Sequence, residues 1–428
     1  MADRVLVLPA GTEIGHEIHD SLEFSRFWEI HGANEVNDHS SLIYRNIHLG
    51  LPNVYHDEFV DAAIALAARI DARFVIPAHD EAVFRLAGTV PAEMLVGPEP
   101  NLAAVLRSKT RTIAALDDVI AGPTEISRNA ATFPMFLKPD RGQGSRGAMI
   151  IRDAEELEAA LARESDCVLQ ELLPGEEITI DCFSDRENIL LYAHGRVRLR
   201  TSGGIATRTA SMPDDFLRAE AEAISSRLKI SGAWFFQVKM DRQGRPKLLE
   251  VANRIAGSSG FQRMRGVNLM EAWLHQKAGR TVAMPEGPFL EIISDRALYS
   301  KVHVALRPET IYVDFDDTII LSNSEINYRL VGLLFGLKYR CGCSIQLITR
   351  HDGIVEQKLK TLALTDLFDH VHHLQRNELK SSVIAGPAAL FIDDSFSERK
   401  EVSRQLGIAS FPLECLETLE GIIEGWHR

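Results

Sequence analysis

The chain has 428 residues and a formal net charge of −13, with 45% hydrophobic and 25% charged residues. This length exceeds what one hydrophobic core usually serves, so roughly two to four domains are expected. The acidic balance disfavours a nucleic-acid-binding protein, because such proteins present basic faces. No apolar run of membrane-spanning length and no signal peptide is visible. Five scattered cysteines form neither a disulfide framework nor a zinc motif, which predicts a reducing cytoplasm as the location.

Residues 1–105 are predicted to form a small α/β unit. A strand at residues 4–8, an amphipathic helix at 57–70 and a buried strand at 74–77 alternate as in a parallel sheet. The last strand ends in His79-Asp80-Glu81, where polar side chains at a sheet edge can contact a ligand. The alternative is that Asp80 only caps the helix that follows.

The next segment begins with Lys109 near the head of a helix that is expected to reach about residue 120. A strand ending at Lys138-Pro139 then enters the flap, residues 142–147, which reads Gly142-x-Gly144-x-x-Gly147. A dinucleotide fingerprint would open a helix at this point. Here an apolar run follows, and a helix begins only at Asp153 with Glu156 in a capping-box position. The glycines therefore lie at a hairpin tip, which predicts a cover over a polyphosphate.

Two further strand pairs carry polar residues. A strand at 168–173 breaks at Pro174-Gly175 before the next strand, and such a break frees backbone groups that can read an adenine edge. Strands at 235–240 and 247–251 form a hairpin in which Gln237 lies about opposite Glu250. Oxygen ligands on neighbouring strands suit Mg²⁺.

These motifs, in this order and approximate spacing, resemble the ATP-grasp superfamily over residues 1–285, and most of all one synthetase half of the carbamoyl phosphate synthetase large subunit. The resemblance implies a pre-ATP-grasp α/β domain at 1–105, an ATP-grasp domain of two α+β subdomains at 106–285, and ATP with Mg²⁺ (or Mn²⁺). It assigns the ATP phosphates to Lys109 and Lys138 with Ser145 and Arg146 above them, adenine to Gln170, Glu171 and Leu172, ribose to Glu177, the metal to Gln237 and Glu250, and an acyl phosphate to Arg254.

One position departs from the pattern of the ATP-grasp superfamily. The family usually has Asn two residues after the metal-binding Glu, whereas this chain has Ala252 there and Asn253 one residue later. Either the turn shifts to bring Asn253 to the metal, or one ligand is missing.

Residues 286–309 are expected to form a linker, and the character of the chain changes after it. Apolar strands at 311–313, 344–348 and 388–392 lead into acidic or hydroxyl residues, which meet at one edge if the sheet is parallel. Lys380 is expected to begin a helix. Capping by aspartate would account for any one of these residues, but not for the whole set: Asp314, Asp316, Thr318, Thr349, Lys380, Asp393 and Asp394.

Residues 310–428 resemble the haloacid dehalogenase superfamily, with all four motifs present. The resemblance implies a Rossmann-like domain in which Asp314 is the nucleophile and Asp316 the general acid and base. Thr349 and Lys380 would hold the phosphoryl oxygens, and the metal set would comprise Asp314, Asp316, Asp393 and Asp394. The short intervals between Thr318, Thr349 and Lys380 leave no room for a large cap domain. The cluster His370, His372 and His373 is expected to lie in a solvated loop.

The leading hypothesis is a bifunctional enzyme. Its first part is predicted to be an ATP- and Mg²⁺-dependent ligase that joins a small-molecule carboxylate to an amine or thiol. Its second part is predicted to be a phosphatase acting on a related metabolite. The alternatives are a kinase-like ATP-grasp enzyme and a second domain that only regulates. No nucleic-acid or membrane partner is expected, and the oligomeric state is open, with a homodimer as one option.

Overall fold

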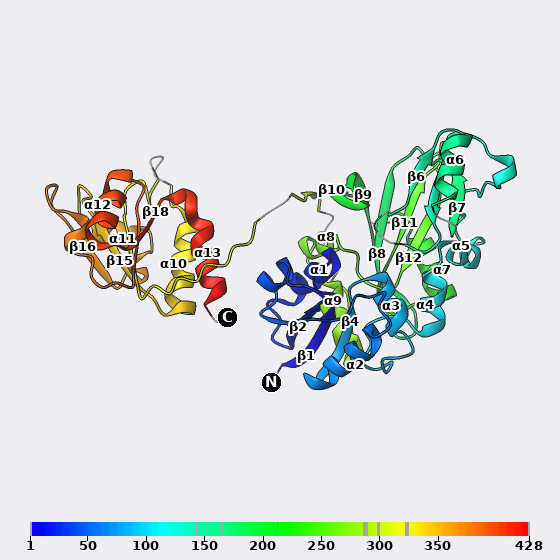
Figure 1. Cartoon of the computed structure of the whole chain (residues 1–428), viewed down its shortest axis with the longest axis horizontal. Coiled ribbons are helices and arrows are strands. Elements are labelled where there is room, and N and C mark those ends of the chain that lie inside the picture. Colours follow the sequence, from blue (N-terminus) through cyan, green and yellow to red (C-terminus); the bar gives the residue numbers. More distant parts are fainter. Residues whose placement is uncertain are drawn as a thin grey trace. The chain divides into compact units, whose positions relative to one another are not determined.

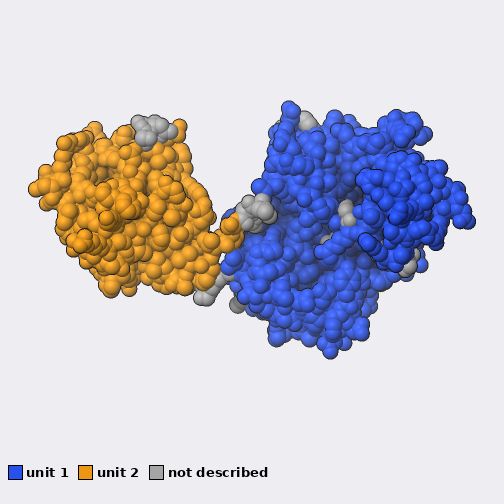
Figure 2. All heavy atoms as spheres, turned by 45° about the horizontal axis from the view of Figure 1, so that its top comes forward, with its two compact units in different colours: residues 1–298 blue, residues 299–428 orange. Residues whose placement is uncertain are grey.

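The computed structural model describes residues 2–142, 144, 146–163, 166–213, 215–285, 290–297, 300–321 and 325–426. The chain divides into two compact units, Met1–Leu298 (unit 1) and Tyr299–Arg428 (unit 2), which Figure 1 and Figure 2 show. Among the described residues, no helix has the length and apolar character needed to cross a bilayer. The finer division of unit 1 at residue 105 stays a prediction.

Unit 1 begins with a parallel sheet in the order β3-β2-β1-β4. Residues 5–8 of the central strand are fully buried, because helices cover both faces of the sheet. His79, and not Asp80, caps the following helix by accepting from the Glu81 backbone N–H at 3.1 Å. The expectation that Asp80 is the cap was therefore wrong. The elements are β1 (Asp3–Leu8), α1 (Glu13–Leu22), β2 (Trp28–Asn34), β3 (Asn46–Leu49), α2 (Phe59–Arg69), β4 (Ala72–Pro77) and α3 (Asp80–Leu86).

A small antiparallel sheet follows, in the order β6-β5-β7. The flap joins β5 to β6, which pair antiparallel, so the predicted hairpin is confirmed. The Asp153 side chain accepts from the Glu156 backbone N–H at 2.9 Å and caps the helix that starts after the hairpin. The elements are α4 (Pro100–Leu106), α5 (Lys109–Leu116), β5 (Met135–Pro139), β6 (Met149–Ile151), α6 (Ala154–Leu161) and β7 (Cys167–Glu171).

A larger sheet in the order β12-β11-β8-β9-β10-β13 completes unit 1. Alternate residues of its central strands, such as Ile178 and Phe236, form an apolar core with α7 on one face. The residues between them, such as Gln237, point to the opposite face. The last strand lies inside the expected linker and pairs with β10. The elements are β8 (Glu177–Ser184), β9 (Leu190–Ser202), β10 (Ile205–Ser211), α7 (Arg218–Leu228), β11 (Gly232–Met240), β12 (Pro246–Ala252), α8 (Gly260–Met264), α9 (Leu269–Lys277) and β13 (Ile293–Asp295).

Unit 2 contains a five-stranded sheet in the order β16-β15-β14-β17-β18, and every pair of neighbours is parallel. The histidine cluster forms the edge strand β16, so the prediction that it lies in a loop was wrong. Lys380 begins a helix as predicted, a short 3-10 helix at Lys380–Ser382. The elements are β14 (Thr310–Val313), α10 (Tyr328–Cys341), β15 (Ser344–Thr349), α11 (Val355–Thr361), β16 (His370–His373), β17 (Ala389–Ile392), α12 (Phe396–Leu406), β18 (Ala409–Phe411) and α13 (Leu416–Gly425).

Candidate active sites

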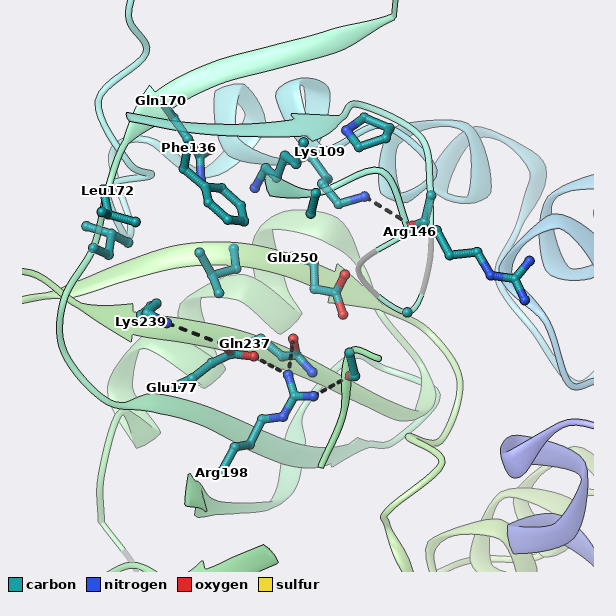
Figure 3. Close-up of a pocket in the computed structure, with 18 of the residues that line it drawn as sticks. Lys109, Phe136, Arg146, Gln170, Leu172, Glu177, Arg198, Gln237, Lys239 and Glu250 are labelled. Atoms are coloured by element: carbon teal, nitrogen blue, oxygen red, sulfur yellow. Dashed lines mark hydrogen bonds and ion pairs between the residues drawn. The ribbon is translucent and has the colours of Figure 1, made fainter. Parts of the chain in front are cut away.

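A pocket of about 180 Å³ lies in unit 1 between the small sheet and the larger one. Figure 3 shows Lys109, Phe136 and Gln170 on one side of it and Glu177, Gln237 and Glu250 on the other. Nine of the residues predicted to handle the nucleotide or its metal line this one pocket: Lys109, Lys138, Arg146, Gln170, Glu171, Leu172, Glu177, Gln237 and Glu250. Of the other two predicted residues, Ser145 lies outside the described residues and Asn253 lines an adjoining cavity.

Two lysines from different elements meet at the flap end of the pocket. Asp140, directly after β5, accepts from the backbone N–H of Thr110 at 2.8 Å and fixes the start of α5 beside the end of β5. Lys138 is buried, with 7% of its surface exposed. Burial, and then repulsion by Lys109, lower the pKa of Lys138 to about 8, against the opposing attraction of Glu250. A pair of cations of this kind, one of them buried, is a site for an anion.

The flap is hydrogen-bonded to one of these lysines. The Nζ atom of Lys109 donates to the carbonyl oxygen of Gly142 at 3.1 Å. Gly144 and Gly147 have φ values of +65° and +74°, which only glycine adopts without strain. A Cβ on Gly147 would also lie 2.9 Å from Cγ of Pro139. The position of the flap therefore depends on glycine and on the phosphate-binding lysine that we predicted.

Gly147→Ala is expected to raise the KM for ATP about tenfold, since it adds left-handed strain and a clash at the foot of the flap. The matched control is Gly244→Ala in the β11–β12 turn, which has the same φ of +74° but no atom within 4 Å of the added Cβ. Steady-state kinetics with ATP as the varied substrate should separate the two variants. Equal KM values in both would show that the flap geometry does not matter.

The opposite wall supplies the oxygen atoms. Gln237 of β11 pairs directly with Glu250 of β12, so the predicted register is confirmed. Glu177 forms ion pairs with Arg198 and, at 3.8 Å, with Lys239. Arg198 also donates to Gln237 Oε1 at 3.3 Å. The side-chain oxygens of Gln237 and Glu250 fit Mg²⁺, which takes few protein ligands and leaves positions for phosphate oxygens.

Sequence reasoning missed Arg198 and Lys239, which line the pocket and bind Glu177. Lys239 could have been predicted from the sequence, because it lies two residues after Gln237 and therefore on the same face of the strand. Two further arginines of the larger sheet, Arg200 and Arg208, pair with Asp295 at 2.9 and 2.8 Å.

Arg254 and Asn253 line a second, adjoining cavity together with Glu250. Arg254 is buried, pairs with Asp80 and stacks over the Phe235 ring. The Asn253 amide nitrogen donates to the carbonyl oxygens of Ser231 and Ala233, at 3.2 and 3.0 Å. The amide nitrogen is thus bound to the start of β11, which favours the alternative in which one ligand is missing, while the assignment of the Asn253 side-chain oxygen to the metal stays a prediction.

The residues predicted to bind adenine lie at the end of β7 (Gln170 and Glu171) and directly after it (Leu172). The Glu171 carboxylate accepts from the backbone N–H of Thr124 at 2.8 Å, and its own N–H donates to the Thr124 carbonyl oxygen. Glu171 therefore fixes the strand end, while Leu172 contributes an apolar wall to the pocket.

In unit 2, three carboxylates gather where β14 and β17 end. Oxygen atoms of Asp314, Asp393 and Asp394 all lie within 4.8 Å of one another. Lys380 donates to Asp314 at 2.5 Å and to Asp393 at 2.6 Å. Burial raises the pKa of Asp314 to about 7, although Lys380 opposes this shift. The cluster has the donor atoms that a divalent cation prefers.

The remaining predicted residues of unit 2 surround this cluster. Thr318 Oγ1 accepts from the Asp394 backbone N–H at 3.1 Å, and Thr349 Oγ1 accepts from His351 N–H at 3.0 Å. Asp316 does not join the three clustered carboxylates; its carboxylate contacts His351 Nδ1 at 2.8 Å. The assignment of the Asp316 side chain to the metal set is therefore corrected, and its predicted acid–base role stays open.

Comparison with known proteins bears on unit 1. A family model described as ATP-grasp in the biosynthetic pathway with Ter operon matches residues 163–293. Pyruvate carboxylase of Schizosaccharomyces pombe is 25% identical, over 52% of this chain and 22% of that protein. The biotin carboxylase domain of Hydrogenobacter thermophilus 2-oxoglutarate carboxylase has a TM-score of 0.56 at 16% identity, covering 66% of this chain and 71% of that chain. An L-amino acid ligase from Bacillus licheniformis has a TM-score of 0.51 at 18% identity, covering 66% of this chain and 75% of that chain.

Unit 1 has an ATP-grasp fold. The chain spans less than a quarter of the pyruvate carboxylase that it matches, and the similarity to the solved structures concerns the fold alone. In this ATP-grasp fold the pocket lies between two antiparallel sheets, with cations on the flap side and carboxylate and amide oxygens on the other (Figure 3).

Proposed function

We propose that unit 1 is an ATP- and Mg²⁺-dependent ligase that joins a small-molecule carboxylate to an amine or a thiol. The observation that carries this proposal is the single pocket in which Lys109 and Lys138 face Gln237 and Glu250. A similar protein, the 2-oxoglutarate carboxylase domain, was solved with MgADP and bicarbonate.

The pocket residues account for the difficult part of such a reaction. A carboxylate is a poor electrophile, and transfer of the γ-phosphoryl group of ATP to it gives a mixed anhydride. Lys109 and Lys138 offset the charge on the phosphoryl group, and Mg²⁺ held by Gln237 and Glu250 would do the same from the other side. An amine then attacks the acyl carbon, the C–N bond forms and phosphate leaves. Arg254, in the adjoining cavity, is our candidate for steadying that phosphate.

An assay of ADP release across mixtures of carboxylates and amines tests this proposal. ADP should form only when both substrates are present, and mass spectrometry should find an amide product. ATP binding without turnover in any mixture would contradict a ligase. A phosphorylated product without an amide would favour the kinase-like alternative.

Nucleotide binding is expected to take up protons near pH 8. Free Lys138 has a pKa of about 8, and a bound polyphosphate raises it by attraction, so the complex holds more protons than the free protein. The affinity for ATP should therefore fall as the pH rises above 8. Calorimetry in buffers of different ionisation enthalpy measures this uptake directly, and Lys138→Met should abolish it.

We propose that unit 2 is a Mg²⁺-dependent phosphatase. The clustering of Asp314, Asp393 and Asp394 around Lys380 supports this. In the proposed reaction an Asp314 oxygen attacks phosphorus, the ester P–O bond breaks, and Asp316 protonates the leaving oxygen. Water, deprotonated by Asp316, then hydrolyses the aspartyl phosphate. Release of phosphate from a panel of phosphate monoesters, with and without Mg²⁺, tests the proposal.

A further inference from the structure

One helix of unit 2 carries an exposed aromatic stripe. Tyr328, Phe335 and Tyr339 of α10 are 75%, 38% and 69% exposed. They lie at positions i, i+7 and i+11, which is one face of a helix. The opposite face, with Leu330, Leu334 and Leu337, is buried in the core of unit 2. Exposed apolar patches of this size are often interaction sites.

The fourth position of the stripe is Gly332, and no described atom of unit 2 requires glycine there. A Cβ on Gly332 would meet no atom within 4 Å, whereas a Cβ on Gly336 would meet Ile423 Cδ1 at 2.8 Å. Glycine in the middle of a helix is unfavourable. Gly336 is explained by packing against α13 (Leu416–Gly425), which lies beside α10 in Figure 1. Among the described residues of unit 2, no contact explains Gly332, and close approach by a second molecule would explain it.

The spacing of the stripe is self-complementary. Positions 328, 332, 335 and 339 follow the alternating steps of four and three that two paired helices share. If a second α10 runs antiparallel across a two-fold axis between residues 333 and 334, Tyr328 faces the partner's Tyr339. The partner's Phe335 then faces Gly332, where the missing side chain leaves room for the ring. The same holds in reverse, as a two-fold interface demands.

The basic side chains at the edges of the stripe are each paired with an acidic residue of the same unit, so their charges do not oppose the pairing of two α10 helices. Arg329 is held by Glu417 and Glu420, each at 3.1 Å, and Lys338 by Asp369 at 2.7 Å. The three rings expose about 350 Å² on each copy. Two copies together reach about half of a standard interface, enough for the apolar centre of one.

We propose that α10 is a homodimerisation surface, on which a second copy of this chain packs antiparallel through Tyr328, Gly332, Phe335 and Tyr339. The proposal is independent of either proposed activity, because none of these residues lines a pocket described above.

Sedimentation velocity of the full chain from about 1 to about 100 µM tests the proposal. The wild type should pass from monomer to dimer across this range. Gly332→Glu fills the space needed by the partner's Phe335 and should weaken association at least tenfold, while its melting temperature does not fall. Arg340→Ala, an exposed residue of the same helix off the stripe, is the matched control and should leave association within twofold of the wild type.

A swap of the two central residues tests the register. Gly332→Phe and Phe335→Gly should each weaken the dimer, and the double variant should restore it, because the two positions face one another across the axis. A chain that stays monomeric throughout, an association unchanged in Gly332→Glu, or a double variant weaker than both single variants would overturn the proposal.

Discussion

Asp314→Asn is expected to lower phosphatase activity at least about 10³-fold, since an amide cannot serve as the nucleophile. The substitution keeps the volume of a side chain that is almost fully buried and removes a carboxyl group whose pKa burial raises to about 7. Lys380 keeps Asp393 as its partner, so the local structure should persist. Phosphate release from a monoester in the presence of Mg²⁺ measures the effect.

Asp352→Asn is the control for this prediction, because Asp352 is an exposed acid in the loop after β15 whose ion-pair partner, among the described residues, is the exposed Arg376. It should retain wild-type activity. ADP formation by unit 1 should be unchanged in both variants if the two units carry separate reactions. Phosphatase activity of Asp314→Asn above a few per cent of the wild type would end the assignment of Asp314 as nucleophile.

The parts of the site that sequence predicted are those fixed by short-range rules. The two-strand register that brings Gln237 opposite Glu250 follows from one hairpin and its turn. The cluster of Asp314 and Asp393 follows from the ends of neighbouring parallel strands, β14 and β17. In both cases the residues that come together lie on strands that pair directly, so the prediction did not require knowledge of the whole fold.

The residues that sequence missed depend on strand order. Arg198 reaches Glu177 because β9 lies beside β8. The local residue pattern around Arg198 does not show which strand will be its neighbour. The sequence likewise did not show that Asp295, within the expected linker, would pair with Arg200 and Arg208.

Asn253 and Asp80 show a different limit. A one-residue shift relative to the family pattern left two alternatives for Asn253, and only its bonds to the Ser231 and Ala233 carbonyls favour one of them. Aspartate is a common N-cap residue, but the carboxylate of Asp80 accepts a hydrogen bond from the buried Arg254, 174 positions away. Residue preferences at helix starts cannot foresee a partner so distant in the chain.

Lys138→Met is expected to lower kcat/KM for ATP by about 10²–10³-fold and at the same time to stabilise the protein. The loss of activity follows from removing a desolvated cation from the phosphates. The gain in stability follows from the pKa of about 8, which lies below the ordinary 10.5 because burial and Lys109 disfavour the charge. At pH 7 that charge costs the folded state on the order of 3 kcal/mol. Lys229→Met, at an exposed lysine of the same unit, is the control and should change neither property.

The pH dependence of the melting temperature separates this explanation from a simple packing effect. The folded pKa of Lys138 is lowered, so its cost is full below pH 8, declines as the folded state loses the proton, and vanishes above 10.5, where both states are neutral. The advantage of Lys138→Met should therefore shrink between pH 8 and 10.5. MgATP should raise the melting temperature of the wild type more than that of the variant, because binding supplies the anion that the buried lysine lacks. A variant that is less stable at pH 7 would show that Lys138 stabilises the folded state. A variant that is more stable and inactive would show that the fold tolerates an unfavourable buried charge for the sake of the phosphates.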